Sequence, residues 1–203
     1  MFVRVGPEAG FVGMKQTVDV LNRMQADGIF ARYAIGGAVA AYNYVEASAT
    51  DDLDILICFD GLSGQPRSGL LLLAPIVAYL AAAGYSDWHA EGLLIEGWPV
   101  QFLPVADGLD AEALAEAQEI ELEINSSESP VKTWILRAEH VVAIALKVGR
   151  MKDRLRILQF LEEEAVAISK LRSVLVRNGL GEKWQTFCRQ AAIIDPCQTK
   201  DRP

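Results

Sequence analysis

The chain has 203 residues, of which 51% are hydrophobic, and a formal net charge of -8 at pH 7. This length and apolar content suffice for a full hydrophobic core, and the acidic balance argues against a general nucleic-acid coat protein. The sequence has neither an apolar run of 18 residues nor a basic segment followed by an apolar core at its start, so we expect a cytoplasmic protein with no membrane partner.

Charge divides the chain into two parts. Residues 1–129 hold 5 Lys+Arg and 19 Asp+Glu, whereas residues 130–190 hold 12 and 6. An acidic first part suits a metal-binding face, and a basic second part could meet the phosphates of a nucleotide or of RNA. The alternative is that the basic residues solvate helices and pair with the acidic part. The three cysteines have no CxxC spacing, so we expect neither a disulfide framework nor a zinc site.

The first predicted elements lead to a pair of glycines. Apolar residues recur every three or four positions over residues 13–27, which predicts a helix, and the apolar run over residues 30–35 predicts a strand. Gly36 and Gly37 follow, and they lead into a helix that we expect to end near residue 45. Glycines at such a junction let the backbone approach a phosphate, and the free N–H groups of a helix start favour an anion.

Two carboxylates mark the next predicted strand, over residues 53–59. Its apolar residues alternate with Asp52 and Asp54, so the apolar side chains should face the core and both carboxylates should project from the opposite face. Carboxylates this close repel each other, and a cation between them offsets the repulsion. Mg²⁺, or Mn²⁺ in its place, is the natural ion because carboxylate oxygens and substrate phosphates are its usual ligands. A solvated acidic turn before a core strand is the alternative.

Residues 60–129 complete the predicted α+β part of the chain. After a turn-rich linker we expect a helix over residues 70–83, a hairpin with arms at 93–95 and 100–103, a helix over 107–118 and a strand over 120–124. A polar stretch then predicts a boundary. We therefore expect an α+β domain of residues 1–129 and a C-terminal helical region of residues 130–203, with one more strand over 131–136 at its start.

The second region is predicted to be mainly helical, with helices over residues 138–148, 153–167, 169–178 and 182–191. Three cations, Lys147, Arg150 and Lys152, surround the tight bend between the first two of these helices. Asp153 could cap the second helix or hold one of the cations. An exposed basic corner between helices is the alternative. For His140, whose neighbours are apolar at helical spacing, we expect a packing or capping role.

The order of strand, Gly-Gly turn, helix and Asp-x-Asp strand resembles the nucleotidyltransferase superfamily of DNA polymerase β type. The similarity is to its small bacterial members, which include the toxins of type IV toxin–antitoxin systems. Their motifs map onto Gly36, Gly37, Asp52 and Asp54, and a Thr at the position of Thr50 is common there. The segment of residues 139–153, from Glu139-His140 to the Gly-Arg-x-Lys-Asp bend, looks more loosely like the C-terminal signature of the same families.

That resemblance implies a small mixed sheet with flanking helices, followed by a helical region, and a site for an NTP with Mg²⁺ or Mn²⁺. It implies that Asp52 and Asp54 are catalytic and hold the metal, and that the nucleotide is bound by Gly36, Gly37, Thr50, Lys147, Arg150 and Lys152. A third carboxylate usually comes from the neighbouring strand, where this chain has Gln101, an amide that cannot act as a base. Glu91 and Glu96 are nearby acids that could replace it, although a surface role is the simpler expectation for each.

Two functions remain open on these residues. The first is a metal-dependent nucleotidyltransferase that moves a nucleoside monophosphate from an NTP to a hydroxyl of RNA, of a protein or of a small molecule. The second is a catalytically silent protein of the same fold that binds a nucleotide or a protein partner, and Gln101 favours it. The resemblance to toxins adds the expectation of an antitoxin-like partner.

Overall fold

The computed structural model describes residues 2–4, 13–46, 50, 52–60, 73–123 and 129–198. Within these residues the strands are β1 (Phe2–Arg4), β2 (Arg32–Ile35), β3 (Leu53–Cys58), β4 (Trp88–His89), β5 (Gly92–Ile95), β6 (Trp98–Pro104), β7 (Gln118–Glu123) and β8 (Val131–Ile135). The helices are α1 (Met14–Ala26), α2 (Gly37–Ala41), α3 (Ala74–Ala82), α4 (Gly108–Ala115), α5 (Ala138–Val148), α6 (Met151–Glu162), α7 (Ile168–Arg177) and α8 (Gly181–Gln190).

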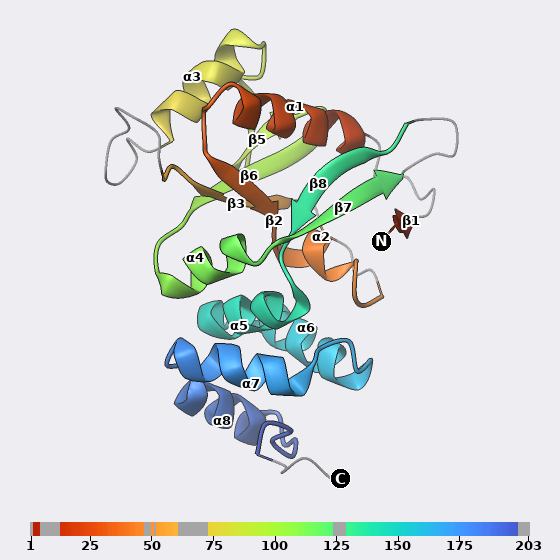
Figure 1. Ribbon diagram of the computed structural model, residues 1–203, viewed down its shortest axis with the longest axis vertical. Helices are drawn as coiled ribbons and strands as arrows, with labels where there is room; N and C mark the ends of the chain where they lie inside the picture. The colour runs from red at the N-terminus through yellow and green to blue at the C-terminus, as the bar shows by residue number, and fades with distance from the viewer. Residues whose placement is uncertain are drawn as a thin grey trace.

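The strands form one mixed sheet in the order β1-β7-β8-β2-β3-β6-β5-β4. β2 and β3 are antiparallel, β3 and β6 are parallel, and the register pairs Asp54 of β3 with Gln101 of β6. Helices α1 and α3 cover one face of the sheet, and α2 and α4 lie on the other, with α5 to α8 beyond them (Figure 1). The chain is therefore an α+β protein with C-terminal helices, as the sequence predicts.

The strand β3 has one fully apolar face. Leu53, Ile55 and Ile57 are completely buried, and Asp54 lies between the first two, so its side chain points to the opposite face of the sheet. That face is the one on which α2 packs, because Gly37 at the start of α2 lies directly against the Asp54 carboxylate. The predicted alternation of this strand is confirmed.

Strand β8 lies inside the sheet, between β7 and β2. It pairs with β7 along its whole length, whereas its pairing with β2 is confined to Ile35 and Ile135. The strand follows residue 129, where the sequence predicts the domain boundary. The α+β part of the fold therefore extends to Ile135, and the helical region begins with α5 at Ala138.

The backbone preferences of glycine and proline agree with the positions of several turns and helix ends. The hairpin of β5 and β6 turns at Glu96 and Gly97, with φ of 51° and 92°, and positive values at both central residues match the twist of the two arms. Helix α5 ends at Gly149, whose φ is 77°. Pro75 lies in the first turn of α3. Of the helices described, none is both long and apolar enough to cross a lipid bilayer.

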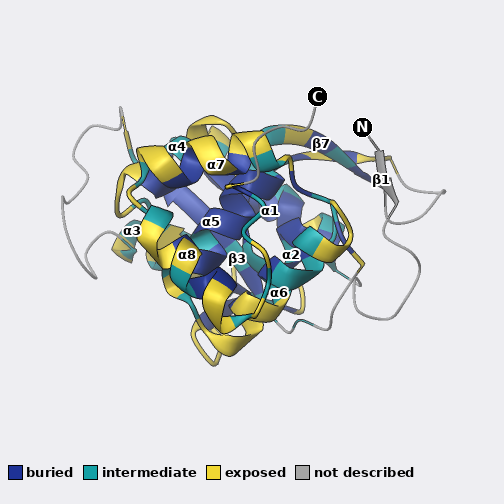
Figure 2. Ribbon diagram, turned by 90° about the horizontal axis from the view of Figure 1, so that it is seen from below, coloured by how far each residue is buried: buried dark blue, intermediate teal, exposed yellow. Residues whose placement is uncertain are grey.

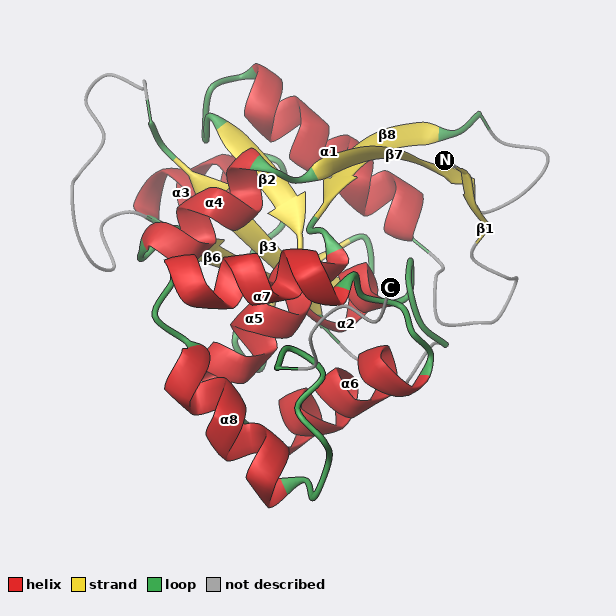
Figure 3. Ribbon diagram, turned by 60° about the horizontal axis from the view of Figure 1, so that its bottom comes forward, coloured by secondary structure: helices red, strands yellow, loops and turns green. Residues whose placement is uncertain are grey.

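Helix α5 is the centre of the helical region. Most of its residues are buried, among them Val142 and Ala143, and Figure 2 shows it enclosed by helices whose outer faces are exposed. Figure 3 shows these C-terminal helices gathered beside α4 and α2 on one side of the sheet. One hydrophobic core runs from α1 through the sheet to α8, so the helical region is joined to the sheet by shared packing.

Candidate functional site

The two predicted carboxylates lie at the start of β3. Asp54 is within the strand and Asp52 immediately precedes it. The Thr50 hydroxyl donates to Asp52 Oδ1 at 2.9 Å, which fixes one oxygen of this carboxylate. A threonine two residues before the first acid therefore orients that acid.

A cavity of about 530 Å³ opens beside Asp52. Its walls come from four parts of the chain: α2, the residues before β3, the β4 to β6 hairpins and α6. Thr50 and Asp52 lie on one wall, and Lys152 and Arg156 of α6 on another. Segments a hundred residues apart thus place acidic and basic side chains around one cavity. The lining residues are Ala38, Thr50, Asp52, His89, Ala90, Glu91, Gly92, Pro99, Gln101, Lys152, Leu155, Arg156 and Gln159.

Two arginines at and near the start of α6, Arg150 and Arg156, are held by one buried acid. Asp153 is 1% exposed; it accepts from Arg150 Nε at 2.9 Å and pairs with Arg156 Nη1 at 3.5 Å. It also accepts from the backbone N–H of Arg150 at 3.1 Å, so it caps the start of the helix. Both roles that the sequence suggests for Asp153 are present. The structure adds Arg156, which sequence analysis missed, although its position one turn after Lys152 puts it on the same helix face.

The pKa of Asp54 is subject to opposing electrostatic effects. Burial and the neighbouring charge of Asp52 raise its pKa, and this rise is opposed by the charges of Lys152, Arg150 and Arg156. Because burial and a like charge both disfavour the ionised form, the ionised pair of acids is stable only beside compensating positive charge. Asp54 itself does not line the cavity; it lies under Gly37, deeper than Asp52.

Gly36 and Gly37 serve the fold at this position. The Gly36 N–H donates to the Asp54 carbonyl oxygen at 2.8 Å, so this group is used within the protein. Gly37 has a φ of 57°, and a Cβ added to it would lie 2.9 Å from Asp54 Cγ and closer still to Oδ2. The helix that follows has only five residues. The glycines therefore allow α2 to approach Asp54, and the hydrogen bond of Gly36 leaves that residue no free N–H for a phosphate.

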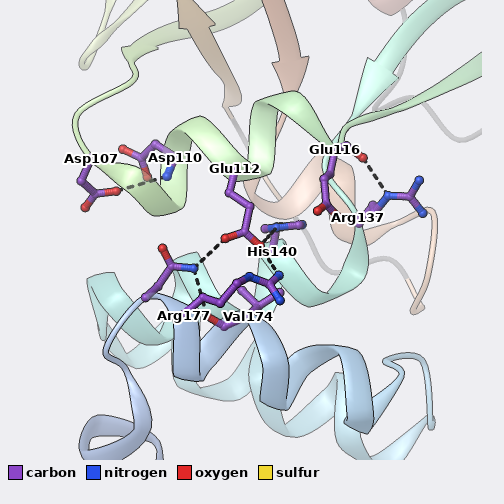
Figure 4. Close-up of polar contacts among 9 residues, drawn as sticks. Asp107, Asp110, Glu112, Glu116, Arg137, His140, Val174 and Arg177 are labelled. Atoms are coloured by element: carbon purple, nitrogen blue, oxygen red, sulfur yellow. Dashed lines mark hydrogen bonds and ion pairs between the residues drawn. The ribbon is translucent and has the colours of Figure 1, made fainter.

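Lys147 lies away from the cavity, unlike Lys152. Its Nζ is 2.9 Å from Asp107 Oδ2 and 2.7 Å from Asp110 Oδ1, and these acids stand at the start of α4, where Figure 4 shows them. One helical turn before the bend, Lys147 projects toward α4 rather than toward β3. The structure thus brings Asp52, Asp54, Thr50, Arg150 and Lys152 together and leaves Lys147 outside.

Gln101 has a partner in the cavity wall. Its Nε2 donates to Glu91 Oε2 at 3.1 Å, and both residues line the cavity. Glu96, the other acid that could replace a third carboxylate, is at the far turn of the hairpin, where it accepts from the Tyr85 hydroxyl. Of the two candidates, the structure places only Glu91 beside Asp52. The sequence could not show which of Glu91 and Glu96 lies nearer Asp52. The position of Glu91 depends on a turn after the strand β4, and two residues are too few for a periodic pattern to be detected.

The acids fit a divalent ion that takes part of its ligands from a substrate. No group of three or more His, Cys, Asp or Glu side chains suited to a metal occurs in the described part of the chain. Mg²⁺ usually takes one or two carboxylates and completes its shell with phosphate oxygens and water. Of the two acids here, Asp52 lines the cavity and Asp54 lies beneath Gly37. Burial and the charge of Asp52 raise the pKa of Asp54, so a cation bound beside it would favour its ionised form.

Comparison with known proteins adds no assignment: no family model and no curated protein sequence matches this chain.

Proposed function

We propose that this protein is a metal-dependent nucleotidyltransferase that moves a nucleoside monophosphate from an NTP to an acceptor hydroxyl. The observation that carries the proposal is the cavity that Asp52, Lys152 and Arg156 all line. A triphosphate with a divalent ion needs carboxylates for the ion and cations for the phosphate oxygens. The resemblance of the glycine turn and the Asp-x-Asp strand to nucleotidyltransferases points to the same chemistry.

The residues have separate tasks in this proposal. Asp52 and Asp54 hold the ion, which when bound would neutralise phosphate charge and stabilise the charge that develops during in-line displacement. Lys152 and Arg156 bind the phosphates of the nucleotide. Arg150 adds charge at the edge of the site, and Asp153 keeps both arginines in place. Because these groups are preorganised, they stabilise the departing pyrophosphate without rearranging.

Isothermal titration with MgATP, MgCTP, MgGTP and MgUTP tests the site. We expect the wild type to bind at least one of them and Asp52→Asn to lose that binding. Asp60→Asn is the matched control, because Asp60 is an exposed acid beyond the opposite end of β3 and should bind as the wild type does. Equal binding by the wild type and Asp52→Asn would remove the basis of the proposal.

A silent nucleotide-binding protein is the second candidate, and Gln101 favours it. The register places this neutral amide directly beside Asp54, where an acid would add both charge and a base. Incubation with α-³²P-labelled NTPs separates the two functions. Label on an acceptor indicates transfer, whereas NTP binding that depends on Asp52 and gives no label with RNA, protein or small hydroxyl compounds indicates the silent protein.

A further inference from the structure

Glu91 and Gln101, which line the first cavity, also line a second one. A smaller cavity of about 190 Å³ lies between α3 and the β4 to β6 strands, and Glu91 and Gln101 line both cavities. The two spaces are therefore adjacent across this pair. Among the described residues, Glu91 is the one carboxylate that lines both cavities.

The smaller cavity is apolar apart from this pair. Its other lining residues are all apolar, among them Ile76 and Val77 of α3 and Phe102 of β6. Trp88 lies at its edge and is 57% exposed, which leaves the indole free to cover a ring. Its volume is below the 300–1,000 Å³ or so that is usual for drug-sized ligands, so it suits a single ring system.

Charge separates the two cavities as well. The first has Lys152 and Arg156 in its wall, whereas none of the residues that line the second is Lys or Arg. A polynucleotide needs cations along its phosphates, and the smaller cavity offers none among the described residues. An uncharged molecule is the better occupant.

Glu91 is the acid that remains for proton transfer. Besides Asp52, it is the one carboxylate among the described residues that line the first cavity. Gln101 Nε2 donates to its Oε2 at 3.1 Å, which holds the carboxylate at the boundary between the two spaces. A proton acceptor at this boundary is placed to serve a hydroxyl that enters from the apolar side.

We propose that Glu91 is the general base of the transfer and that the acceptor is a small uncharged molecule or side chain whose hydroxyl is attached to an apolar ring seated against Trp88. The inference rests on the proposed function. The acceptor O–H gives its proton to Glu91 while its oxygen forms the new bond to the α-phosphorus. The bond from that phosphorus to the bridging oxygen breaks, pyrophosphate leaves beside Lys152 and Arg156, and Glu91 returns its proton to water.

The test uses the full chain as wild type, Glu91→Gln and Trp88→Ala, with Glu96→Gln as the control from the same hairpin. N-acetyltyrosinamide is the aromatic probe, and a short oligoribonucleotide with a free 3′-hydroxyl is the polyanionic one. Binding of the magnesium–NTP complex and transfer from α-³²P-NTP are measured separately. Glu91 and Trp88 are exposed, so circular dichroism should show both variants folded.

We expect Glu91→Gln to bind the NTP as the wild type does and to lose about 10²- to 10⁴-fold in kcat, the usual contribution of a general base. Trp88→Ala should raise KM for N-acetyltyrosinamide by about tenfold with little change in kcat. Glu96→Gln should match the wild type, and the oligoribonucleotide should not be labelled.

Failure of this inference is separable from failure of the site. If the wild type binds NTP but labels only the oligoribonucleotide, or labels neither probe, the assigned acceptor is wrong. If Glu91→Gln transfers at the wild-type rate, its role as base is wrong, while nucleotide binding and transfer stand. If the wild type binds no NTP, the proposed function and this inference are both overturned.

Discussion

Asp54 is the residue of the candidate site whose ionisation lowers the stability of the folded protein. Its pKa is raised in the folded protein, chiefly by burial and then by Asp52. A carboxyl with a folded pKa above its unfolded value is harder to ionise in the folded state, so folding loses stability as the pH rises through the unfolded value toward the folded one. The cost grows as the carboxyl ionises, and a cation bound beside Asp54 would reduce it.

Removing this charge should therefore stabilise the protein. We expect Asp54→Asn to melt above the wild type at pH 7, by roughly 2–4 °C for each kcal/mol recovered in a chain of this size. Differential scanning calorimetry in chelator-containing buffer measures the shift, and Asp60→Asn should leave Tm unchanged. A lower Tm for Asp54→Asn would show that the carboxylate contributes more as a hydrogen-bond acceptor than its charge costs.

Gly37 lies so close to Asp54 that the space between them cannot hold a side chain at position 37. A side chain here would meet the Asp54 carboxyl group, and the backbone has a φ of 57°, which favours glycine. We expect Gly37→Ala to destabilise the protein by about 1–3 kcal/mol, measured by urea unfolding. Gly84→Ala provides the comparison, because it has a φ of 93° with no neighbour within 4 Å of an added Cβ. A loss no greater than that of Gly84→Ala would mean that α2 shifts freely away from β3.

At the scale of elements, α4 is joined to α5 and α7 by one carboxylate. Glu112 accepts hydrogen bonds from Arg177 and, at 3.0 Å, from Asn178 Nδ2, and its Oε1 is 3.2 Å from His140 Nε2 (Figure 4). His140 is 1% exposed, so it packs within the helices as its sequence context indicates. The hydrogen bond from Arg177, the largest cause, lowers the pKa of Glu112 from 4.5 to about 2.

Acid should weaken this junction over a defined range. Because the folded pKa of Glu112 lies below the unfolded value, its contribution is complete above about pH 4.5 and is lost as the pH falls toward 2. We expect Glu112→Gln to lose about 1–3 kcal/mol at pH 7 and to show a smaller further loss between pH 4.5 and 2 than the wild type. Urea unfolding at several pH values measures both. Parallel pH curves would rule out this role for Glu112.

The elements that the sequence predicts well are those with a complete local signal. β3 begins with alternating apolar and acidic residues, and α5 has a helical repeat that ends at a glycine, so both elements were predicted correctly. The two-residue β4 has no period to detect. Asp195 accepts a hydrogen bond from Trp184 Nε1 at 2.7 Å, and this contact between α8 and the residues that follow it has no periodic signal in the sequence.

The candidate site divides in the same way. Asp52, Asp54 and Lys152 follow from local patterns, and the structure brings them to one place. Lys147 belongs to the same cluster of cations in the sequence, yet its side chain contacts acids of α4. Which neighbour a side chain of α5 contacts depends on how that helix packs. Glu91 joins the cavity through tertiary pairing with Gln101. Partner choice across elements is the information that a single sequence does not carry.

At the scale of the whole molecule, the basic part of the chain meets the acidic part in two ways. Lys147 neutralises acids of α4, whereas Lys152 and Arg156 face the cavity beside Asp52. Lys147 therefore follows the alternative in which basic residues pair with the acidic part, and Lys152 and Arg156 are the cations available to a phosphate in the proposed function. The net charge of -8 is compatible with a locally basic cavity wall, because Lys152 and Arg156 both line that cavity.

The shared core predicts that the sheet and the helices unfold together. Trp98 in β6 and Trp184 in α8 are both buried in the same hydrophobic cluster. We expect two variants, one with Trp98 and the other with Trp184 as its single tryptophan, each to unfold in urea as a single cooperative transition. In each variant the midpoint from fluorescence should equal the midpoint from circular dichroism. Different midpoints by the two methods in one variant would show that the helical region unfolds independently.

The central position of β8 restricts how this protein can be divided. A fragment that stops at residue 129 would lack the strand between β7 and β2, and each of these would then present unpaired N–H and C=O groups along an open edge. Such edges recruit strands from other molecules. The first 129 residues alone should therefore self-associate, and they should not be obtainable as a separate folded protein, although they include both Asp52 and Asp54.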